Sequence, residues 1–235
     1  MRSSCSDRTG STAAPLSEHR RVALALVLLG LSACFSPRVP SALAAKKPPK
    51  NVETIVVVRH GEKPRQGLGL LTCQGLNRAL LLPDWFAANF PPPDVIFAPD
   101  PKVKATEIHG DGQRYDYVRP LLTIGPTAVR FGVPVNTQLP YNDPGLLADT
   151  LLAPEYHGAT VYVAWEHANI VSLAAILLTR FGQTATVPDW DNRDYDTAFV
   201  FTIDWRTRAL RFQVRSEQLG PIPEDCPRTT APLPN

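Results

Sequence analysis

The chain has 235 residues, of which 44% are hydrophobic and 20% charged, and this composition is ordinary for a soluble protein with one folded core. The formal net charge is +2, and removal of residues 1–44, which carry five of the basic and two of the acidic side chains, would change it to −1. A balance this close to neutral, without a dense basic stripe, argues against a nucleic-acid partner.

The first 44 residues have the pattern of a signal peptide. Two arginines precede the apolar run 22–35, which is too short to cross a membrane but has the length of a signal-peptide core. Two processing sites are compatible with the sequence: cleavage before Ala45, after an A-x-A sequence, or attachment of a lipid anchor to Cys34, which ends a lipobox-like sequence. We therefore expect a periplasmic or secreted protein, or alternatively a membrane-attached lipoprotein.

Strand-like and helix-like patterns alternate along the rest of the chain. We expect a linker over 45–52, one domain over 53–220 and a proline-rich tail over 221–235. In chain order, the predicted elements of the domain are a strand 54–58, a helix that starts at Cys73 and ends or breaks at Pro83, a strand 94–98, a helix 119–131, a strand 133–136, a helix 144–152, a strand 160–165, a helix 168–181, and a closing hairpin of 197–204 and 209–215. This alternation is typical of an α/β fold, here a three-layer αβα sandwich with a largely parallel sheet. The connection 99–118 is unusually long, and long ordered loops are often functional.

Two of the four cysteines, Cys73 and Cys226, would remain after cleavage before Ala45. In an oxidising compartment they could form a disulfide that fixes the tail to the body, although two separate thiols fit the sequence equally well. The cysteines and histidines lack the short spacings of metal sites, so we expect no metal and no other cofactor.

The sequence Arg59-His60-Gly61 directly follows the first buried strand. In open parallel sheets, ligands bind at the carboxyl ends of the strands. Gly61 would let the backbone turn sharply near an anion, and the planar guanidinium of Arg59 can grip phosphate oxygens. A neutral His60 imidazole can attack phosphorus and divide a phosphoryl transfer into two steps.

A second motif, Trp165-Glu166-His167, stands at the same topological position after a later strand. Two histidines at the ends of parallel strands could converge on one pocket. His167 would then donate to the phosphoryl oxygens and stabilise the charge that develops there.

These two motifs, the second continuing as Ala168-Asn169, resemble those of the histidine phosphatase superfamily, the clan of cofactor-dependent phosphoglycerate mutases, acid phosphatases and phytases. The resemblance covers about 54–204. It implies a histidine phosphatase-like fold, with His60 as the phospho-accepting nucleophile, Arg59 as a phosphate ligand and His167 as the second pocket histidine. Lys63 stands where acid-phosphatase members often have a phosphate-binding arginine.

The resemblance also implies a second pocket arginine at the start of a helix. Arg119 fits this role, because helix N-termini bind anions. About twenty residues separate this helix from the preceding strand, which departs from the family pattern, so that Arg114, Lys102 or Lys104 could serve instead.

The proton donor is the role with most alternatives. Acid-phosphatase members have an aspartate directly after the second histidine, where this chain has Ala168. Asp143 is the nearest carboxylate in the region that mutase-like members use, although it could equally cap the helix that follows. Glu62 and Glu166 are further candidates.

Together these features predict an exported phosphatase that hydrolyses small phosphomonoesters through a phosphohistidine on His60, without a metal. The missing aspartate keeps one alternative open, a catalytically inactive module of the same fold that binds a phosphate ligand.

Overall fold

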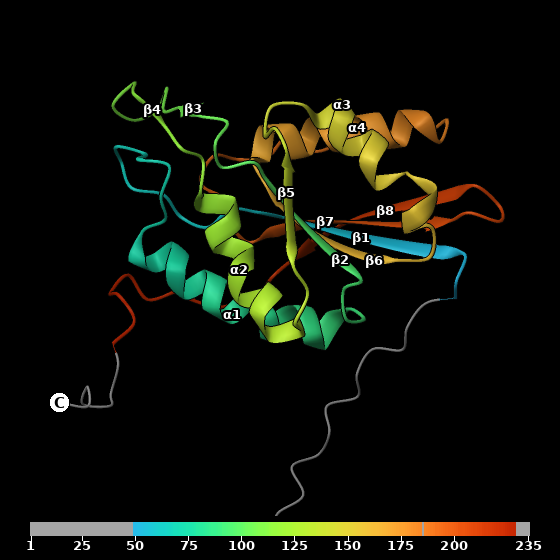
Figure 1. Ribbon diagram of the computed structural model, residues 1–235, viewed down its shortest axis with the longest axis horizontal. Helices are drawn as coiled ribbons and strands as arrows, with labels where there is room; N and C mark the ends of the chain where they lie inside the picture. The colour runs from blue at the N-terminus through green and yellow to red at the C-terminus, as the bar shows by residue number, and fades with distance from the viewer. Residues whose placement is uncertain (1–48, 185, 229–235) are drawn as a thin grey trace, which may run out of the picture. The chain divides into compact units, whose positions relative to one another are not determined.

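The computed structural model describes residues 49–184 and 186–228 (Figure 1). The predicted signal peptide with its two processing sites lies outside these residues, as do the first half of the predicted linker and the end of the tail. The strands are β1 (Val52–Arg59), β2 (Val95–Pro99), β3 (Ala105–Thr106), β4 (Arg114–Tyr115), β5 (Val135–Leu139), β6 (Thr160–Trp165), β7 (Thr197–Asp204) and β8 (Ala209–Ser216). The helices are α1 (Cys73–Asn89), α2 (Arg119–Phe131), α3 (Pro144–Leu151), the 3-10 turn η1 (Pro154–Tyr156) and α4 (His167–Arg180).

Six strands form one sheet in the order β5-β2-β6-β1-β7-β8. The first four strands pair in parallel, whereas β7 is antiparallel to both β1 and β8. The central strands β1 and β6 are almost continuously buried, which explains their apolar runs 55–58 and 161–165. The predicted α/β sandwich with a largely parallel sheet is confirmed.

Helices cover both faces of the sheet and complete three layers (Figure 1). α1 packs with α2 on one face, and α3 packs with α4 on the other. Successive residues of β1 divide between the two cores: Val56 and Val58 belong to the α1–α2 core, and Ile55 and Val57 to the α3–α4 core. None of the helices within the described residues combines the length and the apolar character that crossing a membrane requires.

Helix α1 continues through Pro83, so the predicted end at this residue was wrong. A proline inside a helix removes one backbone hydrogen bond and costs about 3 kcal/mol. Leu82 and Phe86, on either side of it, are fully buried. Because burial of such side chains stabilises by roughly 1.5–3 kcal/mol each, packing against the sheet outweighs the local cost.

The long connection after β2 contains a small hairpin, β3–β4, that no sequence pattern indicated. Its two strands have only two residues each, too few to show an alternation. The hairpin contacts the 64–70 turn, because Asp111 N donates to Gln66 O and, just beyond the hairpin, Arg119 N donates to Gly69 O. The connection is therefore an ordered structure that lies beside the end of β1.

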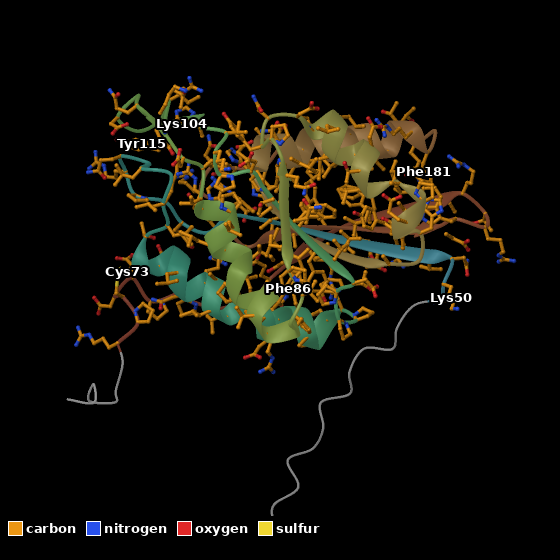
Figure 2. The ribbon with its side chains drawn as sticks, in the orientation of Figure 1. Lys50, Cys73, Phe86, Lys104, Tyr115 and Phe181 are labelled. Carbon is orange, nitrogen blue, oxygen red and sulfur yellow. A yellow bond between two sulfur atoms is a disulfide. The ribbon has the colours of Figure 1, made fainter. Side chains whose placement is uncertain are left out.

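The start of the tail is fixed to α1. Cys73, labelled in Figure 2, forms a disulfide with Cys226, so the pairing that the sequence left open is present. The Asn77 side chain adds hydrogen bonds to the carbonyls of Pro223 and Asp225, at 2.8 and 2.7 Å. The tail is thus attached at the first turn of α1.

Candidate active site

A cavity of about 510 Å³ lies at the carboxyl ends of β1 and β6. The charged and aromatic residues that line it are Arg59, His60, Lys63, Glu107, His109, Tyr117, Arg119, Tyr141, Glu166 and His167. Five of the predicted site residues therefore meet in one place, namely Arg59, His60, Lys63, Arg119 and His167.

The pairing of β1 with β6 brings the two sequence motifs together. Arg59 lies opposite Trp165 in the parallel ladder, and His60 N donates to Trp165 O at 3.0 Å. The residues that follow each strand consequently leave the sheet at the same edge. This is why His60 and His167 share a cavity although 107 positions separate them in the sequence.

His60 is held in the form that a nucleophile needs. Its side chain is 3% exposed, and Nδ1 lies 2.8 Å from the Gly61 carbonyl oxygen. Because a carbonyl can only accept, Nδ1 carries the proton and Nε2 keeps its lone pair. Burial lowers the pKa of His60 well below its ordinary value, and the charges of Arg119 and Arg59 lower it further. The ring is therefore neutral at physiological pH.

Arg59 is fixed by backbone carbonyls. Its Nη1 donates to the carbonyl oxygens of Asp191, Asn192 and Asp194 at 3.3, 3.0 and 2.8 Å. The ring of Tyr195 lies 4.1 Å from the guanidinium carbon and adds a cation–π contact. Nε is buried without a protein partner. The guanidinium is thus positioned beside His60 with a donor still available for an anion.

Arg119, the first residue of α2, is 3% exposed and lies on the same cavity. Its Nη1 donates to Gly67 O at 3.2 Å, and its Nη2 donates to a Glu107 oxygen at 2.5 Å. The Thr123 hydroxyl donates to Arg119 O and accepts from Gly61 N, which ties the start of α2 to the turn after β1. The predicted helix-start arginine is therefore next to His60.

The alternatives to Arg119 do not line the cavity. Arg114 lies exposed on β4. Lys104 pairs with Asp116 at 2.9 Å, both with half or more of the side chain exposed. Lys102 is likewise exposed and outside the cavity lining.

Gly61, which the sequence predicts to let the backbone turn sharply near an anion, packs closely against α1. Its N–H donates to the Thr123 hydroxyl at 2.9 Å, so this amide is already used. A Cβ at this position would lie 2.9 Å from Gly75 O, closer than real Cβ atoms come. Glycine is needed here because the turn after β1 approaches α1 closely.

Glu166 caps α4 and orients His167. One carboxylate oxygen accepts from Asn169 N at 2.9 Å, and the other lies 2.6 Å from His167 Nδ1. Burial opposes ionisation of Glu166, but His167 and the helix N–H groups together lower its pKa to about 2. Glu166 therefore stays a carboxylate beside His167.

Glu62 takes part in a buried ion network instead of the cavity. Both of its oxygens accept from Arg78 of α1, which also donates to Glu217 at 2.9 Å. This network joins the turn after β1 to α1 and to the segment after β8. Glu62 consequently positions the site from outside.

Asp143, the predicted general acid, lies outside the cavity lining. It is exposed, and its Oδ1 accepts from Leu146 N at 2.8 Å as the N-cap of α3. The sequence allowed both roles, and the structure places the residue in the cap.

Glu107 is the site residue that sequence reasoning missed. It is 2% exposed and contacts Arg119 and Lys63, the latter at 3.2 Å. No motif surrounds it, since it lies in the middle of the long connection. The only signal was the length of that connection, combined with a carboxylate within it.

The cavity presents nitrogen donors, which suit an anion. Among residues 49–184 and 186–228, no group of three or more His, Cys, Asp or Glu side chains is arranged to hold a metal ion. Of the two remaining histidines in that range, His109 lines the cavity and His157 stacks on Trp205 at 3.5 Å, beside the opposite end of β1.

No protein-family model matches the sequence, and no curated protein matches it. Solved structures that this chain is similar to include a mycobacterial glucosyl-3-phosphoglycerate phosphatase (13% identity, TM-score 0.45, covering 70% of this chain and 97% of that one). A phosphoglycerate mutase from Plasmodium falciparum has 13% identity and a TM-score of 0.45, with 76% and 99% covered. A phosphoserine phosphatase mutant from Entamoeba histolytica, in complex with phosphoserine, has 14% identity and a TM-score of 0.45, with 70% and 98% covered.

The state of the His60 ring can be measured directly. Because burial and two neighbouring arginines lower its pKa, we expect nitrogen NMR to show a neutral ring, protonated on Nδ1, at pH 6.5. Because the unfolded chain would protonate this histidine more readily, we expect His60 to lower the free energy of unfolding as the pH falls below 6.5. His60→Gln assigns the signal. An imidazolium, or a proton on Nε2, at pH 6.5 would contradict the arrangement.

Proposed function

We propose that this chain hydrolyses phosphomonoesters through a phosphohistidine on His60. The observation that carries the proposal is the buried His60 ring, whose Nδ1 lies 2.8 Å from Gly61 O, in one cavity with the buried side chains of Arg59 and Arg119. A phosphoryl group at Nε2 would lie beside Arg59, whose buried Nε has no protein partner and is already in place as charge develops.

The residues divide the reaction into two steps. Arg59, Arg119 and His167 hold the phosphoryl oxygens while His60 Nε2 attacks phosphorus. The bond from phosphorus to the ester oxygen breaks, and that oxygen leaves with the electron pair and requires a proton. Water then attacks the phosphohistidine, phosphate departs, and Nε2 recovers its lone pair.

A second function is favoured by one feature of the sequence. Ala168 follows His167 where a proton-donating aspartate could stand, so the cavity could bind a phosphate ligand without turnover. Hydrolysis of p-nitrophenyl phosphate separates the two functions, because a binding module would bind phosphate and release no nitrophenol.

His60→Ala should abolish hydrolysis of p-nitrophenyl phosphate, because the nucleophile is lost. Wild-type enzyme quenched during turnover should carry acid-labile phosphate on His60, detectable by mass spectrometry of its peptides. Asp143→Asn is the control: asparagine also caps helices, so this variant should keep its activity. Wild-type turnover by His60→Ala would refute the phosphohistidine.

Arg119→Ala should weaken inhibition by inorganic phosphate, because a charge-assisted hydrogen bond to the anion is lost. Such a bond is worth roughly 1.5–3 kcal/mol, so the inhibition constant should rise about ten-fold or more. The matched control is Arg114→Ala, which removes an exposed arginine and should change the constant little. Equal effects of the two substitutions would remove Arg119 from the phosphate site.

We further propose that the protein acts outside the cytoplasm. The signal-peptide pattern of residues 1–44 supports this, and so does the Cys73–Cys226 disulfide, since disulfides persist in oxidising compartments.

The intact mass of the protein from an expressing bacterium tests this location. We expect a chain that begins at Ala45 or at a lipid-bearing Cys34. Because of the disulfide, its mass should be lower by two hydrogen atoms than the mass of the same processed chain after reduction. A Cys34→Ser variant that is still released at Ala45 selects the soluble form, and one that stays unprocessed selects the lipoprotein. An unprocessed, reduced chain in the cytoplasm would refute export.

A further inference from the structure

The Glu107 carboxylate pairs with Arg119 and Lys63, the two cationic side chains that would bind phosphate. One oxygen accepts from Arg119 Nη2 at 2.5 Å and from Gly69 N at 3.3 Å, and the other accepts from Lys63 Nζ at 3.2 Å. Glu107 belongs to the β3–β4 hairpin, which Figure 2 marks by the labels Lys104 and Tyr115. The hairpin thus carries an anion into a cavity built for anions.

Close packing against the 64–70 turn holds Glu107 there. A Cβ on Gly67 would lie 2.2 Å from the Glu107 carboxyl carbon, and a Cβ on Gly69 would lie 2.0 Å from Asp116 O. Both glycines also have positive φ, 90° and 65°. Only glycine permits this approach, so the turn and the hairpin are built to meet at the carboxylate.

The backbone of Glu107 is equally constrained. Its N–H donates to Gln113 O at 3.0 Å, and its carbonyl accepts from Gly110 N and Gly112 N at 2.8 and 3.1 Å. These bonds do not involve the carboxylate, so a change of side-chain partners would leave the hairpin backbone in place.

The charge of Glu107 depends on the same two cations. Burial opposes its ionisation, but Arg119 and Lys63 outweigh this and hold its pKa below the ordinary value. The titratable and charged groups around it are Lys63 before α1, Arg119 of α2, Tyr115 of β4 and His109 of the hairpin. A phosphate dianion on Arg119 and Lys63 would take away these partners and add a negative charge, which favours the protonated acid.

The other candidate carboxylates are already engaged. Glu166 caps α4 with a pKa of about 2, Glu62 pairs with Arg78, and Asp143 caps α3 at the surface. Glu107 is the carboxylate of the described cavity lining whose proton affinity a bound phosphate would change most directly.

We infer that the substrate's phosphoryl group displaces Glu107 from Arg119 and Lys63, that Glu107 takes up one proton as it is displaced, and that the acid so formed protonates the leaving oxygen. This inference rests on the proposed function.

The protons balance over the cycle. Glu107 gives its proton to the leaving oxygen as the phosphorus–oxygen bond breaks and the phosphorus–nitrogen bond forms. Glu107 then takes a proton from the attacking water. At the same time the phosphorus–nitrogen bond breaks, and the electron pair of that bond returns to His60. When phosphate leaves, Glu107 rebinds Arg119 and Lys63 and releases the proton to solvent.

Glu107→Gln tests this role with two substrates. The value of kcat/KM for an alkyl phosphate should fall about a hundred-fold or more, because an alkoxide needs the proton. The value of kcat/KM for p-nitrophenyl phosphate covers only the steps up to release of nitrophenolate, and it should change little because nitrophenolate leaves without a proton. Inorganic phosphate should inhibit the variant more tightly, about ten-fold, because a competing charged partner of Arg119 is removed. General damage to the site would instead lower kcat/KM for both substrates and weaken inhibition.

Calorimetry on the wild-type enzyme gives a second test should the variant fail to fold. Sulfate remains a dianion across neutral pH, so any proton that the buffer loses when sulfate binds is taken up by the protein. We expect titrations in two buffers of different ionisation enthalpy to show proton uptake when sulfate binds the wild-type enzyme. The His60→Ala variant should show the same proton uptake. No uptake in His60→Ala, equal losses on both substrates, or weaker phosphate inhibition of Glu107→Gln would overturn the role of Glu107 alone. Failure of the wild-type enzyme to hydrolyse p-nitrophenyl phosphate would overturn the proposed function itself.

Discussion

The parallel pairing of β1 with β6 is the constraint on which the rest of the site depends. It places Arg59 opposite Trp165 and thereby aligns the two chain segments that follow. A shift of one residue would turn every side chain of the strand to the other face of the sheet. Both faces are packed against helices, so such a shift would destroy two cores at once. The position of His60 is thus enforced by packing far from the cavity.

Two buried arginines are a liability that the fold handles in different ways. A buried charge is costly unless it is hydrogen-bonded or paired. Arg59 is held by neutral carbonyls, so its positive charge is not cancelled and acts on His60 and on any bound anion. Arg119 is paired with a carboxylate, so its charge is compensated until another anion replaces that partner. The charge of Arg59 thus acts on the cavity at all times, whereas the charge of Arg119 is available only to an anion that replaces Glu107.

Local patterns predicted the elements whose signals are local. The strands 160–165 and 197–204 match the structure to the residue, because long β-branched and aromatic runs mark them. The continuation of α1 through Pro83 could not be read from the chain, since burial against the sheet decides it. The motifs placed His60 and His167 together because strand ends converge. Glu107 was not predicted, because its place in the site depends on contacts with Arg119 and Lys63 that form only in the folded chain.

The buried network around Arg78 has a consequence for how the molecule assembles. Arg78 belongs to α1, but one of its two closest carboxylate partners, Glu217, lies beyond β8, 139 positions later. Strand β1 likewise needs both β6 and β7 as neighbours. Contacts between positions so distant in sequence form slowly, because long loops must close first. The turn that carries His60 therefore acquires its supports only after nearly all of the domain is available. During synthesis from the N-terminus, the chain would therefore lack a complete site until β8 and the segment after it have folded.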